Sequence, residues 1–270
     1  MKLTALVLAV ALPAFAIETR VREGDVQATP ALTDAEGRPL ADGKYIQRVV
    51  GNVVHVEAIY DFPDGRRATE KASLKLKPKL EQLSWEYLER RGSETIRHYA
   101  VDLRTRKAVA EKPLEGKHWE ETVDVEPGET FAGIGMVYAV KSLRPRIPAG
   151  SEVKLHAIAF TPKPRSVGVA IQHDGPDSVR MAGREILSDR FTVHPLVPAI
   201  AKLFVKAPDQ HIWLYRGEPA AFLRFKGTSV EPTDPVVHVD LVPGAPVSRA
   251  EARTARAEAR TPKPARAVRK

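Results

Sequence analysis

The sequence predicts a mainly β protein: an antiparallel, strongly curved sheet or partly open barrel of about eleven strands, with two short helices. In most segments after Tyr45, apolar and polar residues alternate with a period of two, which is typical of half-buried strands. Short turns separate these segments, and no strand–helix–strand alternation appears, which disfavours parallel α/β folds. Because long open sheets curl, about eleven strands in one domain favour strong curvature.

The first sixteen residues have the pattern of a secretory signal peptide. Lys2 gives the positive start, a short apolar run extends from Leu3 to Leu12, and Ala14-Phe15-Ala16 is an A-x-A cleavage site. The run is about half as long as the roughly 20 residues that a membrane span needs. We therefore expect a bacterial periplasmic or secreted protein, cleaved after Ala16, with no membrane span.

The first strand series is expected over residues 45–126, after an irregular lead-in at 17–44. Alternating apolar residues from Val54 to Phe62 predict one strand of this series. The sequence Pro63-Asp64-Gly65 predicts the turn that follows, since Pro presets φ and Gly accepts a positive φ. Similar alternation continues in further segments, so this half reads as a meander of five or six strands.

A helix and a second strand series are expected next. Apolar residues between 130 and 143 have helical spacing and are followed by Pro145 and Pro148, although Gly133 and Gly135 weaken this helix prediction. Strands are then expected between 151 and 241, with Asp174-Gly175-Pro176-Asp177 as a turn. A second helix is expected to begin near Pro198. Residues 45–244 therefore read as a single β-rich domain.

Composition excludes several classes of protein. The chain has no cysteine, which excludes a lipid anchor at the cleavage point, disulfides, a cysteine-ligated zinc and thiol catalysis. The net charge of +8 lies mostly in a basic tail, residues 245–270, and the remaining body is close to neutral. No nucleic-acid partner is expected from so balanced a body.

The basic tail is expected either to be disordered or to form a short helix. Four of its arginines are spaced four, three and four residues apart, which would place them on one helix face. Ser248 and Glu251 have the spacing of a capping box, and Pro262 ends the pattern. A contact with an anionic envelope surface is the functional hypothesis for these arginines: Arg249, Arg253, Arg256 and Arg260.

No catalytic, cofactor-binding or metal site is predicted. The eight histidines form no pair with metal-ligand spacing, and the chain has no G-x-S-x-G, P-loop or dinucleotide motif. Carboxylates or histidines brought together from separate strands would escape this search. The protein is therefore expected to lack enzymatic activity, with an envelope hydrolase as an open alternative.

The aromatic residues permit two interpretations. They are either ordinary core residues or the lining of an apolar cavity inside the curved sheet, since half-barrels often provide such cavities. The candidate lining residues are Trp85, Tyr87, Tyr99, Phe131, Tyr138 and Trp213.

Several motifs resemble a family of exported bacterial domains of unknown function. They are the segment Arg146-Ile147-Pro148-Ala149-Gly150 before a strand, the turn Gly183-Arg184-Glu185, and the late pair Trp213-Leu214 and Phe222-Leu223-Arg224-Phe225. The resemblance implies export and a curved sheet like that of the lipoprotein carriers LolA and LolB. It supplies no catalytic residues. This chain departs from LolB in lacking a lipidation cysteine.

Three functional hypotheses follow. The first is a non-enzymatic binding or scaffold protein of the bacterial cell envelope that holds a lipid or another apolar ligand in a curved sheet, or docks an envelope protein. The second is the hydrolase described above. The third is a structural or assembly module that acts through an exposed strand edge.

Overall fold

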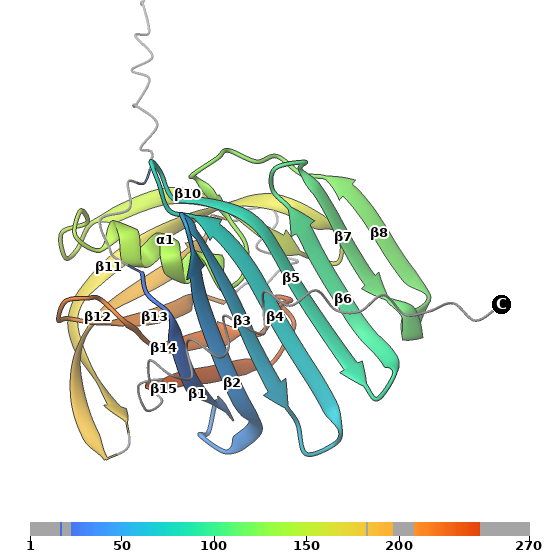
Figure 1. Cartoon of the computed structure of the whole chain (residues 1–270), viewed down its shortest axis with the longest axis horizontal. Helices are drawn as coiled ribbons and strands as arrows, with labels where there is room; N and C mark the ends of the chain where they lie inside the picture. The colour runs from blue at the N-terminus through green and yellow to red at the C-terminus, as the bar shows by residue number, and fades with distance from the viewer. Residues whose placement is uncertain (1–16, 18–22, 182, 197–207, 244–270) are drawn as a thin grey trace, which may run out of the picture.

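The computed structural model describes residue 17 and residues 23–181, 183–196 and 208–243. These residues form one curved sheet of fifteen strands (Figure 1). All neighbouring strands are antiparallel except β9 and β10, which are parallel. The mainly β, curved-sheet prediction is confirmed.

The first half of the chain is a continuous meander in which each strand pairs with the next. A single 3₁₀ turn, Pro113–Glu115, interrupts it before the last strand. Its strands are β1 (Val26–Asp34), β2 (Pro39–Val50), β3 (Val53–Asp61), β4 (Arg66–Lys75), β5 (Glu81–Arg91), β6 (Glu94–Asp102), β7 (Lys107–Lys112) and β8 (Lys117–Thr122).

The second half is a second meander, preceded by one helix. Strand β1 pairs with β15, which joins the two halves into one sheet, and β8 and β9 lie at the two ends of its strand order. The elements are β9 (Thr130–Phe131), α1 (Gly135–Leu143), β10 (Glu152–Phe160), β11 (Pro164–Met181), β12 (Arg184–Pro195), β13 (Gln210–Tyr215), β14 (Phe222–Thr228) and β15 (Val236–Pro243).

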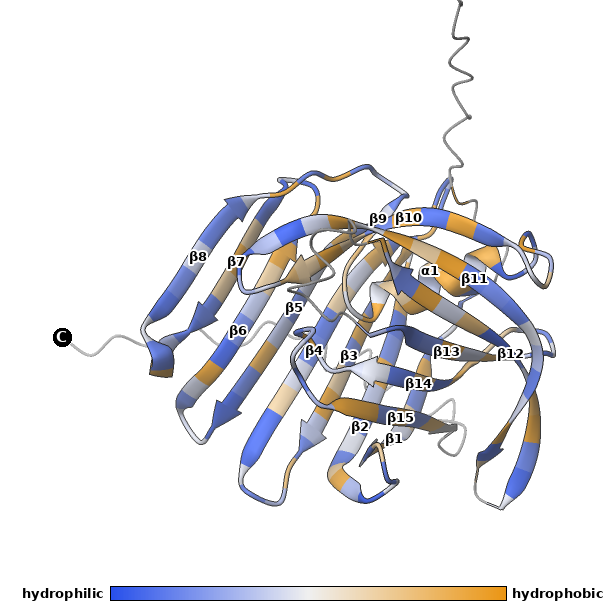
Figure 2. Cartoon of the chain, turned by 180° about the vertical axis from the view of Figure 1, so that it is seen from behind, coloured by the Kyte–Doolittle hydropathy of each residue, from blue (hydrophilic) through white to orange (hydrophobic). Residues whose placement is uncertain are grey.

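The core lies on the concave face of the sheet, where α1 is also packed (Figure 1). Hydrophobic and hydrophilic residues alternate along many strands (Figure 2), as a sheet with one buried face requires. In β3, Val54, Val56 and Ala58 are buried while the intervening side chains are more exposed. Every residue of α1 is buried. Among the described residues, no helix is long and apolar enough to cross a membrane.

The strand count was predicted too low, at about eleven instead of fifteen. Residues 17–44, expected to be irregular, contain β1 and the start of β2. The expected turn at Asp174–Asp177 lies inside the eighteen-residue strand β11, as an irregularity between His173 and Gly175. Gly175 has a φ of +108°, a conformation that glycine permits without steric cost.

The helix prediction was correct in place but too long. Residues 130 and 131 form β9, and α1 begins only at Gly135. The described residues contain this single α-helix instead of two. The second helix was expected near residue 198, which lies outside the described residues, as do the signal segment and the basic tail.

Candidate functional site

An aromatic group lies at the centre of the concave face. Trp85 and Tyr87 alternate along β5, Tyr99 comes from β6, and Phe160 ends β10. The ring centroids of Trp85 and Tyr99 lie 5.3 and 5.0 Å from that of Phe160, and those of Tyr87 and Tyr99 lie 6.3 Å apart. These distances are typical of interacting aromatic pairs. We call these four residues the inner aromatic cluster.

The structure brings five of the six predicted lining residues into one core. Trp85, Tyr87 and Tyr99 belong to the inner aromatic cluster, Phe131 is fully buried in β9, and Tyr138 is buried in α1. The sixth, Trp213, packs against a separate small group that contains Val179, Met181 and Leu223. Its indole N–H donates to Asp177 Oδ2 at 2.9 Å.

Phe160 was missed as a member of this group, although it ends a segment expected to be a strand. The period-two pattern indicates which face of a strand is buried, but it does not show which distant strand lies opposite. The structure places β10 against β5 and β6 by curling the sheet, and this juxtaposition depends on tertiary packing.

A loop contacts two residues of the inner aromatic cluster, Tyr87 and Tyr99. Residues Ser229–Pro235 connect β14 to β15, and we call them the covering segment. Tyr99 Oη donates to Glu231 Oε1 at 2.5 Å, and Lys112 Nζ lies 2.8 Å from the same oxygen. Val230 packs against the core as a partly buried apolar side chain. Charged and polar contacts therefore supply much of the attachment of this segment to the sheet.

A second ionic contact holds the other end of the covering segment. Arg97 of β6 lies between Asp234, at 2.9 Å, and Glu89, at 2.6 Å. Arg66 also binds Glu89, at 2.8 Å, and the Glu89 side chain is only 4% exposed. Buried carboxylates require such partners because desolvation of an unpaired charge is costly.

The phenols of the inner aromatic cluster are neutral at physiological pH. Burial raises the pKa of Tyr87 to about 12. Burial and the hydrogen bond to Glu231 raise the pKa of Tyr99 well above its ordinary value. The cluster therefore presents neutral aromatic rings, with its charges at the rim, on Arg97 and Glu231.

The helix α1 is fixed by a second polar group. Tyr138 Oη contacts Tyr45 Oη at 3.0 Å and also donates to Gln47 Oε1. Lys141 Nζ lies 2.6 Å from Glu23 Oε1. Burial raises the pKa of Tyr138 well above its ordinary value. These contacts attach α1 to β2 and to the chain that precedes β1.

Glu70 connects α1 to the inner aromatic cluster. Its Oε1 accepts the Trp85 indole N–H at 2.7 Å and the Ile134 backbone N–H at 2.8 Å. Burial raises the pKa of Glu70, and this effect exceeds the opposing effect of the two hydrogen bonds. The backbone N–H at the start of α1 and the Trp85 indole therefore both donate hydrogen bonds to the Glu70 carboxylate.

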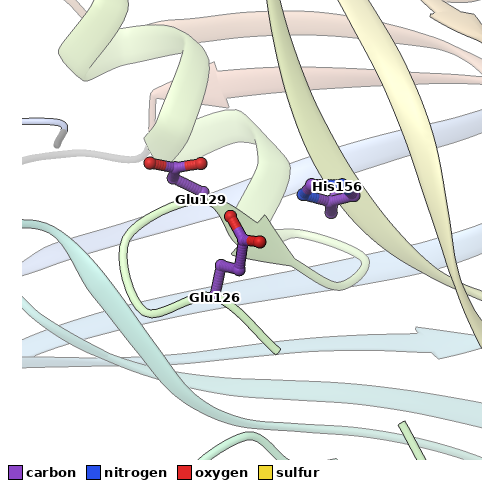
Figure 3. Close-up of side chains that lie close together, drawn as sticks. All are labelled: Glu126, Glu129 and His156. Carbon is purple, nitrogen blue, oxygen red and sulfur yellow. The ribbon is translucent and has the colours of Figure 1, made fainter. Parts of the chain in front are cut away.

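One group in the described part of the chain has the composition of a metal site. It consists of Glu126, Glu129 and His156, whose potential ligand atoms all lie within 4.8 Å of one another (Figure 3). The carboxylates come from the connection between β8 and β9, and the histidine comes from β10. The sequence search looked for closely spaced histidines. It therefore missed this group, whose members come from two separate segments.

The two best-formed pockets among the described residues are open to solvent. One lies on the outer face of β2, β3 and β4, and the other lies beside the β1–β2 hairpin. His55 Nδ1 and Ser73 Oγ are 3.0 Å apart in the first depression. This pair is on an open, convex surface, without the enclosure that a nucleophilic site requires.

Comparisons with solved structures give several similarities, of which two are described here. No family model matches the sequence, and no curated protein matches it. A β-barrel-like protein of the domain of unknown function DUF1849 from Brucella abortus matches with a TM-score of 0.45 and 10% identity, over 83% of this chain and 98% of that one. The hypothetical lipoprotein YmcC from Escherichia coli K12 matches with a TM-score of 0.36 and 12% identity, over 82% of this chain and 86% of that one. At these values neither similarity bears on function.

Proposed function

We propose that this chain is an exported, non-enzymatic protein of the bacterial cell envelope that binds an apolar ligand, such as an acyl chain, against the inner aromatic cluster. The observation that carries the proposal is the covering segment. It contacts the neutral phenol of Tyr99 through Glu231 and is attached to β6 through Asp234. The rings are already buried, so the gain would come from the acyl chain's own apolar surface leaving water, at about 25 cal/mol per Å² of that surface.

Binding requires the covering segment to leave its position. In this structure Trp85, Tyr87 and Tyr99 are at most 6% exposed, and such a closed concave face counts against a ligand bound in this form of the chain. The structure thus corresponds to the ligand-free, closed state in this proposal.

The export part of the proposal rests on residues 1–16. Their charged start, apolar run and A-x-A site are those of a cleaved signal peptide. The intact mass of protein recovered from a periplasmic fraction tests this directly. A mature chain starting at Ile17 is expected, and an uncleaved cytoplasmic chain would refute export.

Binding is tested with a fluorescent fatty acid and with lipid extraction from the purified full chain. We expect a co-purifying lipid or saturable probe binding, and at least fivefold tighter binding by Asp234→Ala, which releases one end of the covering segment. Asp189→Ala is the matched control, since Asp189 is an equally buried partner of Arg144 at 2.8 Å, away from the cluster. No lipid and no saturable binding, or equal tightening in both variants, would refute the ligand proposal.

An assembly module acting through a strand edge receives less support. The edge strand β8 carries Lys117, Glu120 and Glu121 among its six residues. Charged side chains on an edge discourage pairing with another strand. The hydrolase alternative likewise lacks a deep polar cleft among the described residues, where the two best-formed pockets are open to solvent.

A further inference from the structure

The connection between β8 and β9 makes a tight turn that places two glutamates side by side. The N–H of Glu129 donates to the carbonyl of Glu126 at 2.9 Å, with Pro127 and Gly128 at the two central positions. Gly128 has a φ of +85°, which the third position of such a turn favours in glycine. Thr130 Oγ1 also accepts the N–H of Glu126, at 2.9 Å. The turn therefore fixes the backbones of Glu126 and Glu129 close together, and their carboxylate oxygens lie within 4.8 Å of each other.

These carboxylates repel each other unless a positive charge or a proton lies between them. Glu126, His156 and Lys79 all lie close enough to Glu129 to act on it electrostatically. Two carboxyl groups that share one proton are a common state of such a pair. A divalent cation would occupy the same position and neutralise both charges.

His156 is aligned with this pair by main-chain contacts. The backbone N–H of His156 donates to the backbone carbonyl of Glu129 at 2.8 Å. His156 also pairs with Thr130 in the β9–β10 ladder. Its Nδ1 is buried and has no hydrogen-bond partner among the described residues. A buried, unpaired imidazole nitrogen is costly, and metal coordination is one way to satisfy it.

We propose that Glu126, Glu129 and His156 form a zinc site, with water as the fourth ligand. Two carboxylate oxygens and one imidazole nitrogen are a set that suits zinc, and three protein ligands leave one tetrahedral position open. Glu126 is exposed while Glu129 and His156 are partly buried, so the ion has access from solvent. The positive charge of Lys79 acts on Glu129 and would oppose a bound cation.

The position of the site predicts that a bound ion would link two segments of the sheet, even though three protein ligands and a water are the pattern of catalytic zinc. The segment Val123–Glu129 leaves the edge strand β8 at one end of the sheet and enters β9 at the other. A zinc ion bound here would tie this segment to β10. Metal binding would then stabilise the curled form of the sheet in addition to occupying a surface site.

Zinc titration of the full chain after chelator dialysis tests this proposal, with calorimetry and thermal unfolding as readouts. We expect one equivalent of zinc to bind at pH 7 and to raise the unfolding temperature. Glu126→Gln and His156→Gln should each weaken binding at least about tenfold. Glu126 is exposed, so its substitution should leave folding intact. Lys79→Ala should strengthen binding.

Two control variants separate this site from adventitious zinc binding. Glu152→Gln changes an exposed carboxylate on the same strand as His156, and His118→Gln removes a surface histidine that contacts Glu111. Both should bind zinc as the unmodified chain does. No stoichiometric zinc binding, or unchanged binding in Glu126→Gln and His156→Gln, would overturn the zinc site and would leave the apolar-ligand proposal unaffected.

Discussion

Arg97 Nη1 lies 2.9 Å from both carboxylate oxygens of Asp234, although 137 positions separate the two residues. Asp234 also accepts the backbone N–H groups of Val230 and Glu231 at 3.0 Å. A single carboxylate thus organises the covering segment internally and attaches it to β6. This connection attaches the covering segment to the core of the sheet.

Removing this carboxylate should destabilise the fold. Asp234→Ala leaves Arg97, whose side chain is 17% exposed, with Glu89 as its remaining acidic partner and leaves two backbone N–H groups unsatisfied. We expect a loss of about 3 kcal/mol in the free energy of unfolding, measured with urea. Asp61→Ala, which removes an exposed partner of Arg67, should change it little. Equal effects of the two variants would contradict a structural role for the Arg97–Asp234 contact.

The raised pKa of Glu70 predicts a pH dependence of stability. The folded chain holds a proton on Glu70 more tightly than the unfolded chain, whose pKa is close to 4.5. The contribution of Glu70 to stability is therefore fully present below that pH and is lost as the pH rises through the folded pKa. Glu70→Gln cannot ionise, so its stability relative to the unmodified chain should increase as pH rises over this range.

Urea unfolding between pH 4 and pH 8 measures this difference. The exposed Glu94 provides a control, because Glu94→Gln should shift stability equally at all these pH values. A constant offset between Glu70→Gln and the unmodified chain would show that Glu70 does not titrate differently in the folded state.

Gly133 is predicted to be intolerant of any side chain. An added Cβ would lie 2.0 Å from Trp85 Nε1 and 2.3 Å from Glu70 Oε1, and the residue has a φ of +48°. Gly133→Ala should therefore cost about 3 kcal/mol through overpacking and backbone strain, measured by thermal or urea unfolding. Gly24→Ala adds a Cβ to open space and should change stability by no more than about 0.5 kcal/mol.

The basic tail predicts salt-sensitive binding to anionic surfaces. Arg249, Arg253, Arg256 and Arg260 lie outside the described residues, and their proposed role rests on charge and spacing alone. Deleting residues 245–270 should reduce sedimentation with phosphatidylglycerol vesicles at least tenfold at low salt. Vesicles of neutral phosphatidylcholine should bind neither form. Unchanged binding after deletion would assign any surface affinity to the folded body.

Much of the sheet could be predicted because burial on one face produces a readable alternation. Residues Val54 to Phe62 and the turn Pro63-Asp64-Gly65 appear as β3 and its connection to β4. Residues 18–43 contain several turn-forming residues and show no clear period, so at most one short strand was expected where the nine-residue β1 lies, with Pro30 in its middle. The structure accommodates Pro30 opposite Gly43, where a Cβ would lie 2.4 Å from the proline.

The candidate sites were less accessible to prediction. The aromatic residues of β5 and β6 could be identified because they alternate along strands. The covering segment could not, since its contacts with Arg97 and Tyr99 depend on sheet curvature. The Glu126–Glu129–His156 group requires the β9–β10 pairing, in which β9 is only two residues long. Gly133 and Gly135 appeared to weaken the helix, whereas they allow its start to approach Trp85 and Gln82 closely.

The pairing of β1 with β15 has a consequence for the order of folding. Among the described strands it is the only ladder between elements from opposite ends of the chain, with Ala28 opposite Pro243. Every other ladder joins consecutive strands and closes over a short span of chain. Loop-closure entropy therefore makes the β1–β15 ladder the slowest to nucleate. A circular permutant that links these two strands directly and opens the chain at Gly92 would make this ladder local and should fold faster than the natural order.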